Sequence, residues 1–302
     1  MELKDIENFK NQFKTDLFFD ADIKKLNWFN IGGKTKIFFK PKNLKELKEF
    51  LKLYNNRGKI FILGMGSNVL FKDNIYKGVI IKLSKNFRAI SKLKKDTIIA
   101  GSACTQKNLA EYALENEISG FEFMYCIPGS VGGGLKMNSG CFGTEFKDKL
   151  ISLQCIDTKG NIKIIPSNKI KFKYRKIELD ENLIFLSATF RGVASNKNKI
   201  KDLMDNLTKR KNNSQPSKIK TGGSTFKNPI DQTTKKAWEL IKESVPENVN
   251  FGDACISEKH SNFFVNRNNA SFDEMNSLIN FVKKNVKEKT GISINLEIKI
   301  ID

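Results

Sequence analysis

The chain has 302 residues, of which 39% are hydrophobic and 28% charged, so it fits an ordinary globular protein with room for two or three domains. No apolar run approaches the length of a membrane span and no secretory signal is recognisable, so we expect neither. The five cysteines form no C-x-x-C pair, which argues against a disulfide framework or a structural zinc site and favours a reducing cytoplasm.

The formal net charge of +20 would suit a nucleic-acid-binding protein. Two features argue against that class. The lysines are scattered along the whole chain, and only six of the 53 basic residues are arginine, the residue that usually contacts phosphates and base edges. We therefore expect a solvated, lysine-rich surface whose positive potential attracts anionic substrates, and no nucleic-acid partner.

The first part of the chain mixes helical and strand patterns without a regular βαβ period. Helices are expected at 4–14, 43–55 and 105–116. Strands are expected at 35–40, 59–63, 78–83, 97–101, 151–157, 161–166 and 183–190. This mixture predicts an α+β fold.

The strand at 59–63 runs into a short turn, Gly64–Met65–Gly66–Ser67–Asn68. The turn is not a Walker loop, and it does not complete G-x-G-x-x-G because position 69 is valine. Tight turns of this composition are common, so this signal alone is weak. The turn becomes a better candidate for a binding site only together with a second glycine-rich loop.

That second loop is CIPGSVGGGLKMNSGCFG at 126–143, with seven glycine or proline residues and no acidic side chain. Glycine permits positive φ and a close approach to the main chain, and a run of N–H groups can hold an anion. A flexible surface turn is the alternative, but linkers lack the apolar residues that frame this loop. We interpret it as a phosphate-holding loop that lies across a large cofactor.

Near residue 196 the composition shifts to lysine, asparagine and serine, which marks the approach to a second domain. This part is expected to contain helices at 197–212, 235–244 and 272–289, a strand broken by charge at 255–266, and a final strand that includes Glu297. Ser271 and Glu274 have the spacing of a capping box for the helix at 272–289.

Eight motifs in order make the chain, from Trp28 to Glu297, resemble the UDP-N-acetylenolpyruvoylglucosamine reductase family. They are WFNIGG, LGMGSNVL, GFEFMYCIPGSVGGGLKMNSGCFG, YR at 174–175, GGSTFKNP at 222–229, AWELI at 237–241, GDACISEKHSNFFVN at 252–266 and LEI at 296–298. The resemblance implies an FAD-binding region of the vanillyl-alcohol-oxidase (PCMH) type in two α+β subdomains, followed by a smaller α+β substrate domain. We expect an N-terminal helical segment at 1–20, the FAD-binding region at 21–193 with a split near 90, and the substrate domain at 194–302.

The resemblance also implies NADPH-dependent reduction of UDP-N-acetylglucosamine enolpyruvate to UDP-N-acetylmuramate for peptidoglycan, by a hydride relay through non-covalent FAD. Three residues match the family's catalytic positions: Arg175 would bind the substrate carboxylate, Ser224 would protonate the substrate carbon, and Glu297 would stabilise the enol-like intermediate. From the residues alone, a surface arginine, a turn serine and a polar strand residue are the plainer interpretations.

The resemblance implies that both glycine-containing loops contact FAD, through Gly64, Met65, Gly66, Ser67, Asn68, Ile127, Pro128, Gly129, Ser130, Gly132, Gly133, Asn138 and Gly143. Substrate contacts are implied for Asn228 and His260, with Lys227 a further candidate for the diphosphate, although a lone histidine is more often structural and a lysine is more often solvated. No metal site is expected. Ile177 stands where many members carry a hydroxyl residue, so we expect altered surroundings for Arg175. All five tyrosines precede the substrate domain, which indicates the shorter family form without a tyrosine lid, and we expect a monomer.

Three rival functions stay open. One is an oxidase of the same flavin fold, although many such oxidases attach FAD through a histidine and the flavin region has none. Another is a basic nucleic-acid-binding protein, supported by charge only, which would be colourless and would bind duplex in a salt-sensitive way. The third is a non-catalytic scaffold, which the three filled catalytic positions argue against.

Overall fold

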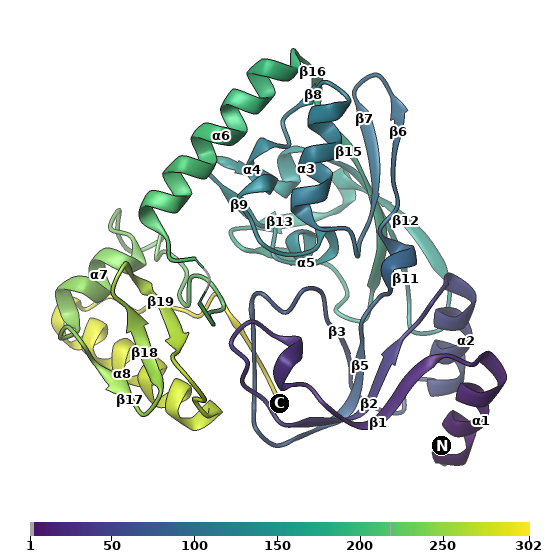
Figure 1. Ribbon diagram of the computed structural model, residues 1–302, viewed down its shortest axis with the longest axis horizontal. Coiled ribbons are helices and arrows are strands. Elements are labelled where there is room, and N and C mark those ends of the chain that lie inside the picture. Colours follow the sequence, from purple (N-terminus) through teal and green to yellow (C-terminus); the bar gives the residue numbers. More distant parts are fainter. Residues whose placement is uncertain (1–2, 218) are drawn as a thin grey trace. The chain divides into compact units, whose positions relative to one another are not determined.

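The computed structural model of the protein describes residues 3–217 and 219–302, and it shows a mixed α+β fold (Figure 1). Its contacts divide the chain into two compact units, each built from three separate segments. The first unit comprises Met1–Phe19, Ile37–Met65 and Gly78–Lys211, and the second comprises Asp20–Lys36, Gly66–Lys77 and Asn212–Asp302. The division into domains at 20/21 and 193/194 stays a prediction.

One sheet of the first unit has five antiparallel strands in the order β12-β11-β15-β7-β6. The strands are β6 (Ile90–Lys94), β7 (Thr97–Gly101), β11 (Leu150–Ile156), β12 (Ile162–Pro166) and β15 (Ile184–Arg191). Helices α3 (Gln106–Glu115), α4 (Glu122–Tyr125) and α5 (Val131–Lys136) contribute to the same core. Phe146 and Phe190 are fully buried there, with ring centroids 5.8 Å apart.

A four-stranded sheet has the order β1-β2-β5-β3, formed by β1 (Asp16–Asp22), β2 (Lys34–Lys40), β5 (Ile75–Ile81) and β3 (Ile60–Ile62). The helices α1 (Leu3–Phe13) and α2 (Leu44–Tyr54) share its core. The helical spacing of Leu47, Phe50 and Leu51 puts all three in that core, where Phe50 lies 4.3 Å from Phe39 between ring centroids. The expected helix at 43–55 is thus confirmed.

The second unit contains an antiparallel meander of β17 (Asn250–Phe251), β18 (Ala254–Ser257) and β19 (His260–Asn266). It packs with α7 (Ala237–Ser244) and α8 (Phe272–Thr290), and β4 (Val69–Phe71) pairs in parallel with β20 (Lys299–Ile301). The capping box of α8 is present as expected, because Ser271 Oγ accepts from Glu274 N and Glu274 Oε2 accepts from Ser271 N.

The remaining elements are short strand pairs, single-turn helices and one long helix. The strand pairs are β8 (Ile118–Ser119) with β16 (Val193–Ala194), β9 (Gly140–Cys141) with β10 (Thr144–Glu145), and β13 (Lys171–Lys173) with β14 (Lys176–Glu178). The single-turn 3₁₀ helices are η1 (Lys24–Leu26), η2 (Lys85–Phe87), η3 (Phe146–Asp148) and η4 (Ser167–Lys169). The long helix α6 (Lys197–Ser214) confirms the helix expected at 197–212.

Three sequence expectations need correction. The broken strand at 255–266 is a hairpin of two antiparallel strands, β18 and β19, because the charged pair Glu258–Lys259 forms its turn. The final strand is only β20, and Glu297 lies in a bend before it, because residues 293–298 pair through a single bridge at Leu296. The glycine-rich loop at 126–143 is not a continuous loop, since it contains helix α5 and strand β9.

Candidate active site

Helix α5 begins directly after Ser130, whose extended backbone and side chain form its N-cap. Ser130 Oγ accepts a hydrogen bond from the N–H of Gly133 at 3.2 Å. The glycines of this helix allow close packing: a Cβ on Gly134 would lie 2.6 Å from the Phe146 ring, and one on Gly132 would lie 2.9 Å from Ser102 Cβ. Tertiary packing therefore explains two of the three consecutive glycines.

The two loops that the sequence singles out meet within the first unit. A Cβ on Gly64 would lie 2.7 Å from Ser130 Oγ, so the end of the first turn lies directly beside the N-cap of α5. Gly129 has a φ of 143°, a conformation that L side chains rarely adopt. The two loops thus lie side by side, as predicted, where Gly64 meets Ser130.

The backbone N–H groups of this neighbourhood fall into two sets. Val131 and Gly132 donate to the carbonyls of Cys104 and Ser102 at 2.8 and 2.9 Å, and Ile127 donates to Met124 at 3.2 Å, so these N–H groups have protein acceptors. The hydrogen bonds of the described residues leave four others without a protein acceptor: Gly64, Met65, Gly129 and Ser130.

These observations fit a phosphate-bearing cofactor such as FAD. The unsatisfied N–H groups lie at and beside Gly64, which packs closely on Ser130, and Gly129, whose φ is positive. Together they form a cradle of donors that can bind a diphosphate. Fewer N–H groups are available to a ligand than we expected from the sequence, because several in the loop donate to carbonyls of the protein itself. All the individual cofactor contacts of the two loops stay predictions, namely those of Gly64, Met65, Gly66, Ser67, Asn68, Ile127, Pro128, Gly129, Ser130, Gly132 and Gly133.

The second half of the first turn belongs to the second unit. A Cβ on Gly66 would lie 2.2 Å from the Leu26 carbonyl oxygen, and the Gly66 carbonyl accepts from Trp28 N at 3.0 Å. The amide of Asn68 donates to the carbonyl of Glu297 at 3.0 Å, and the Asn68 carbonyl accepts from Lys299 N at 3.0 Å. Asn68 therefore ties this turn to the segment that carries a predicted catalytic residue.

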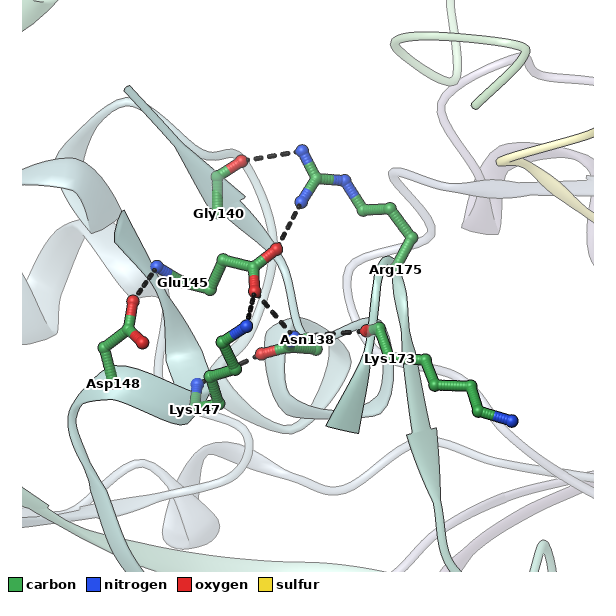
Figure 2. Close-up of polar contacts among 7 residues, drawn as sticks. All are labelled: Asn138, Gly140, Glu145, Lys147, Asp148, Lys173 and Arg175. Carbon is green, nitrogen blue, oxygen red and sulfur yellow. Dashed lines mark hydrogen bonds and ion pairs between the residues drawn. The ribbon is translucent and has the colours of Figure 1, made fainter. Parts of the chain in front are cut away.

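Arg175 lies in the two-residue turn of the hairpin β13–β14, in which Lys173 pairs with Lys176. Its φ is +54°, in the left-handed region that non-glycine residues seldom occupy. Nη2 of the guanidinium donates to the carbonyl of Gly140 at 2.9 Å, and Nη1 lies 3.6 Å from Glu145 Oε1 (Figure 2). Ile177, two residues further, is buried in the core of the first unit, where a hydroxyl would need a partner.

Ser224 and Glu297 lie close together in the second unit. Ser224 forms an antiparallel bridge with Phe263, and the next residue, Thr225, accepts from Glu297 N at 2.8 Å through its carbonyl. The buried side chain of Asn262 stabilises this segment, since its amide exchanges two hydrogen bonds with the backbone of Phe226, at 2.8 and 2.9 Å. The structure thus brings two of the three predicted catalytic residues together, whereas Arg175 belongs to the first unit.

The predicted substrate residues Asn228, Lys227 and His260 make hydrogen bonds within the second unit. Asn228 Oδ1 accepts from Ala237 N, the first residue of α7, at 3.0 Å, and Lys227 donates its backbone N–H to Asn295 at 2.8 Å. His260 Nδ1 accepts from Asn262 N at 3.2 Å, and its ring lies 4.7 Å from that of Phe263. Burial lowers the pKa of His260, which favours the neutral imidazole. Because Nδ1 accepts from Asn262 N, the proton of the neutral ring lies on Nε2.

Two residues with clear contacts to the predicted site were missed from the sequence, Glu145 and Asn262. The acid-free stretch ends at Glu145, and Phe142–Gly143 before it is a turn signal, so a hairpin that presents an acidic residue to the loop was readable there. Asn262 gives no local signal, because its partners lie 36 residues away.

The assigned cofactor residue Asn138 is fully buried, and its side chain contacts Glu145, Lys147 and Lys173 (Figure 2). Gly143 has a φ of 90° with no neighbour within 4 Å of a Cβ, so its turn conformation alone accounts for glycine. Direct contact of either residue with the cofactor stays a prediction.

Among residues 3–217 and 219–302, no group of three or more histidine, cysteine, aspartate or glutamate side chains could hold a metal ion. In the same residues, no helix has both the length and the apolar character that a membrane crossing requires.

Two family models match the chain. Residues 35–165 match an FAD binding domain, and residues 215–301 match the C-terminal domain of UDP-N-acetylenolpyruvoylglucosamine reductase. The enzyme of that name from Pelagibacter ubique is 57% identical over 301 residues, which covers 100% of both chains. The one from Rickettsia typhi is 40% identical over 93% of this chain and 94% of its own. The crystal structure of UDP-N-acetylenolpyruvylglucosamine reductase from Thermus caldophilus is 26% identical, with a TM-score of 0.81 over 95% of this chain and 99% of that chain.

The similarity covers both units, and it agrees with the motif order and the α+β fold. It also bears out the FAD-binding region that the sequence motifs imply. The chain belongs to the UDP-N-acetylenolpyruvoylglucosamine reductase family.

Proposed function

We propose that the protein reduces UDP-N-acetylglucosamine enolpyruvate to UDP-N-acetylmuramate with NADPH as reductant and non-covalent FAD as cofactor, and that Arg175, Ser224 and Glu297 carry out the substrate chemistry. The observation that most strongly supports the residue roles is the hydrogen bond between Glu297 N and the Thr225 carbonyl, which holds the predicted acid and the predicted carboxylate on neighbouring segments. FAD, when bound, supplies the hydride transfer from NADPH to the enolpyruvyl carbon.

The cradle residues bind the cofactor in this proposal. The N–H groups of Gly64, Met65, Gly129 and Ser130 lack protein acceptors, and they are suited to donate hydrogen bonds to its diphosphate oxygens. The buried N-cap of α5 keeps Ser130 in one conformation, because its side chain is already bonded to Gly133. This part of the cradle is therefore held by the protein's own hydrogen bond, without help from the cofactor.

Reduction of the enol ether adds a hydride to its terminal carbon and a proton to the adjacent carbon. Negative charge develops toward the carboxylate between these events, and the guanidinium of Arg175 stabilises that charge. Ser224 then donates its hydroxyl proton to the adjacent carbon, and Glu297 stabilises the enol-like species beside it. A serine hydroxyl is a weak acid, so its neighbours must stabilise the alkoxide that forms.

Asn228, His260 and Lys227 bind the UDP portion of the substrate in this proposal. His260 serves as a neutral hydrogen-bonding group, because burial lowers its pKa. We further propose that the enzyme is a monomer that works in the cytoplasm.

Anaerobic half-reactions test the proposal. The purified protein should be yellow, NADPH should bleach it, and the enolpyruvyl UDP-sugar should restore the colour without oxygen. A colourless protein that cannot be loaded with FAD, or a reduced protein that only oxygen reoxidises, would contradict the proposal.

A further inference from the structure

The hairpin β9–β10 presents two acceptors to one guanidinium. Gly140 and Glu145 are cross-strand partners in this hairpin, joined through a turn at Phe142 and Gly143 in which both residues have positive φ, 53° and 90°. A Cβ on Gly140 would lie 2.3 Å from the Thr144 carbonyl oxygen, so only glycine lets the two strands approach this closely. Register therefore fixes the Gly140 carbonyl and the Glu145 side chain next to each other.

These two groups contact different nitrogens of Arg175. Nη2 donates to the Gly140 carbonyl at 2.9 Å, and Nη1 lies 3.6 Å from Glu145 Oε1 (Figure 2). Two contacts on separate nitrogens fix both the position of a planar guanidinium and its rotation. The 3.6 Å separation is longer than a charge-assisted hydrogen bond, so Glu145 orients Arg175 mainly by charge.

Glu145 is itself held in place. Its Oε2 accepts from Asn138 Nδ2 at 3.1 Å and from Lys147 Nζ at 2.8 Å, and its backbone N–H donates to Asp148 at 2.8 Å. The carboxylate thus has partners on both oxygens. The contact with Glu145 also raises the pKa of Lys147.

Asn138 extends the network to the other hairpin. The same amide that donates to Glu145 donates to the carbonyl of Lys173 at 3.3 Å, two residues before Arg175 (Figure 2). Its Oδ1 accepts from Lys147 N at 3.0 Å, and the residue is fully buried. The end of β13 directly before the turn of Arg175, and the carboxylate that faces the guanidinium, are therefore joined through one buried side chain.

The backbone conformation of Arg175 also indicates that its side chain is held in place by its surroundings. Its left-handed φ is unfavourable for arginine, so surrounding contacts must maintain it. Residues in such conformations often belong to functional sites, where the strain serves to aim a side chain.

We propose that Glu145 is a positioning residue that orients Arg175 for the substrate carboxylate. This inference rests on the proposed role of Arg175 in the reductase reaction. Glu145 does not touch the substrate; it acts through the guanidinium, and the Asn138 link transmits its position to the hairpin β13–β14.

The test uses Glu145→Gln, which keeps the shape and removes the charge, with Glu178→Gln as matched control. Glu178 is a carboxylate on the arginine's own hairpin, and it pairs with Lys173 Nζ at 2.5 Å. In Glu145→Gln, we expect reoxidation of NADPH-reduced enzyme by the enolpyruvyl UDP-sugar to slow about 10- to 100-fold, the range for a misplaced reacting group. Flavin reduction by NADPH, flavin content and melting temperature should stay at wild-type values, and Glu178→Gln should match wild type throughout.

A double-mutant cycle with Arg175→Lys tests whether Glu145 acts through the arginine. If it does, Glu145→Gln adds less than about twofold to the loss already caused by Arg175→Lys, since the effects of coupled residues do not add. Full additivity would overturn the inference, as would wild-type reoxidation kinetics in Glu145→Gln. If Glu145→Gln and Glu145→Asp both lose flavin and melt early, the residue is only structural and the inference also fails. Failure of the wild-type enzyme to reoxidise with the sugar would instead overturn the proposed function.

Discussion

The N–H of Glu297 donates to the carbonyl of Thr225 at 2.8 Å. Glu297 is therefore hydrogen-bonded to the residue that directly follows Ser224. The carbonyl of Glu297 in turn accepts from the amide of Asn68 at 3.0 Å. Segments more than 200 residues apart in sequence therefore meet at one point. Both contacts are made by the backbone of Glu297, so they fix the position of its main chain within the second unit.

Ser224→Ala tests the proposed proton donor. The substitution removes the hydroxyl and leaves the backbone contacts of Thr225 in place, so the fold should be retained. We expect NADPH to reduce the flavin at the wild-type rate while formation of UDP-N-acetylmuramate falls about 10²- to 10⁴-fold, the usual contribution of a general acid. Stopped-flow measurement of the two half-reactions separates these effects.

Ser257→Ala is the matched control, since it removes a serine hydroxyl of the same unit that bonds Lys259 N at 3.3 Å. This variant should turn over at nearly the wild-type rate. Full turnover by Ser224→Ala, or an equal loss in both half-reactions, would contradict the assignment of the proton donor.

Asn262→Ala tests what holds Ser224 in place. The Asn262 side chain is buried, and its loss leaves the N–H and the carbonyl of Phe226 without partners. Each buried unsatisfied group costs about 1–3 kcal/mol, so with two such groups the free energy of unfolding should fall by about 2–6 kcal/mol. Urea unfolding followed by circular dichroism measures this change.

Asn250→Ala serves as the comparison for Asn262→Ala. The exposed Asn250 donates to the Asn248 carbonyl at 3.2 Å, and its loss should change the unfolding free energy by less than about 0.5 kcal/mol. Similar destabilisation by the two variants would mean that the buried network of Asn262 contributes little.

Local patterns in the sequence predicted much of the fold. Helical spacing identified Leu47 and Phe50 as core residues, and the Ser271–Glu274 capping box has both of its expected hydrogen bonds. Each of these features depends on residues within a few positions of one another, which is the range that sequence periodicity reports.

Helix α5 was not predictable in this way, because three consecutive glycines each cost about 1 kcal/mol relative to alanine in a helix. Its stability depends instead on the packing of Gly134 against Phe146, a contact that requires the tertiary fold. The hydrogen bond between Thr225 and Glu297 joins residues that are distant in sequence, and so do the contacts of Arg175 with Gly140 and Glu145. Neither set of contacts leaves a local pattern. The sequence motifs named the residues, and only the structure shows their partners.

Gly64→Ala tests the cofactor cradle. The new Cβ would lie 2.7 Å from Ser130 Oγ, so the N-cap or the turn must shift, and overpacking of this kind costs about 1–3 kcal/mol. Because the N–H groups of Gly64 and Ser130 would bind the diphosphate, we expect FAD affinity to fall about tenfold or more, since 1.4 kcal/mol is a factor of ten. Flavin absorbance and titration of the apoprotein with FAD measure the loss.

The double variant Gly64→Ala, Ser130→Ala shows whether the clash is responsible. Removing Oγ leaves the Ser130 Cβ 3.8 Å from the new methyl group, an ordinary contact, although the N-cap bond to Gly133 is lost as well. The loss of FAD affinity caused by Gly64→Ala should therefore be smaller in the Ser130→Ala background than in the wild-type background. Equal costs in both backgrounds would show that Ser130 is not the obstacle.

His260 gives a direct test of burial in the second unit. It is the only histidine in the sequence, so the untagged protein should show one imidazole C2–H signal in proton NMR. Burial lowers the pKa of His260, and we expect this signal to titrate below the usual value of about 6.5. A midpoint at or above that value would contradict the burial of the ring.

The same shift has a signed effect on stability. Between the folded-state pKa of His260 and about 6.5, the unfolded chain binds more protons than the folded one, so the unfolding free energy contributed by this residue falls as pH falls through that range. Above pH 7 the imidazole is neutral in both states and the contribution is constant. The difference in unfolding free energy between wild type and His260→Gln should therefore shift against the wild type from pH 7.5 to pH 5.5. An unchanged difference would mean that His260 is protonated equally in both states, and the ring would then be open to solvent.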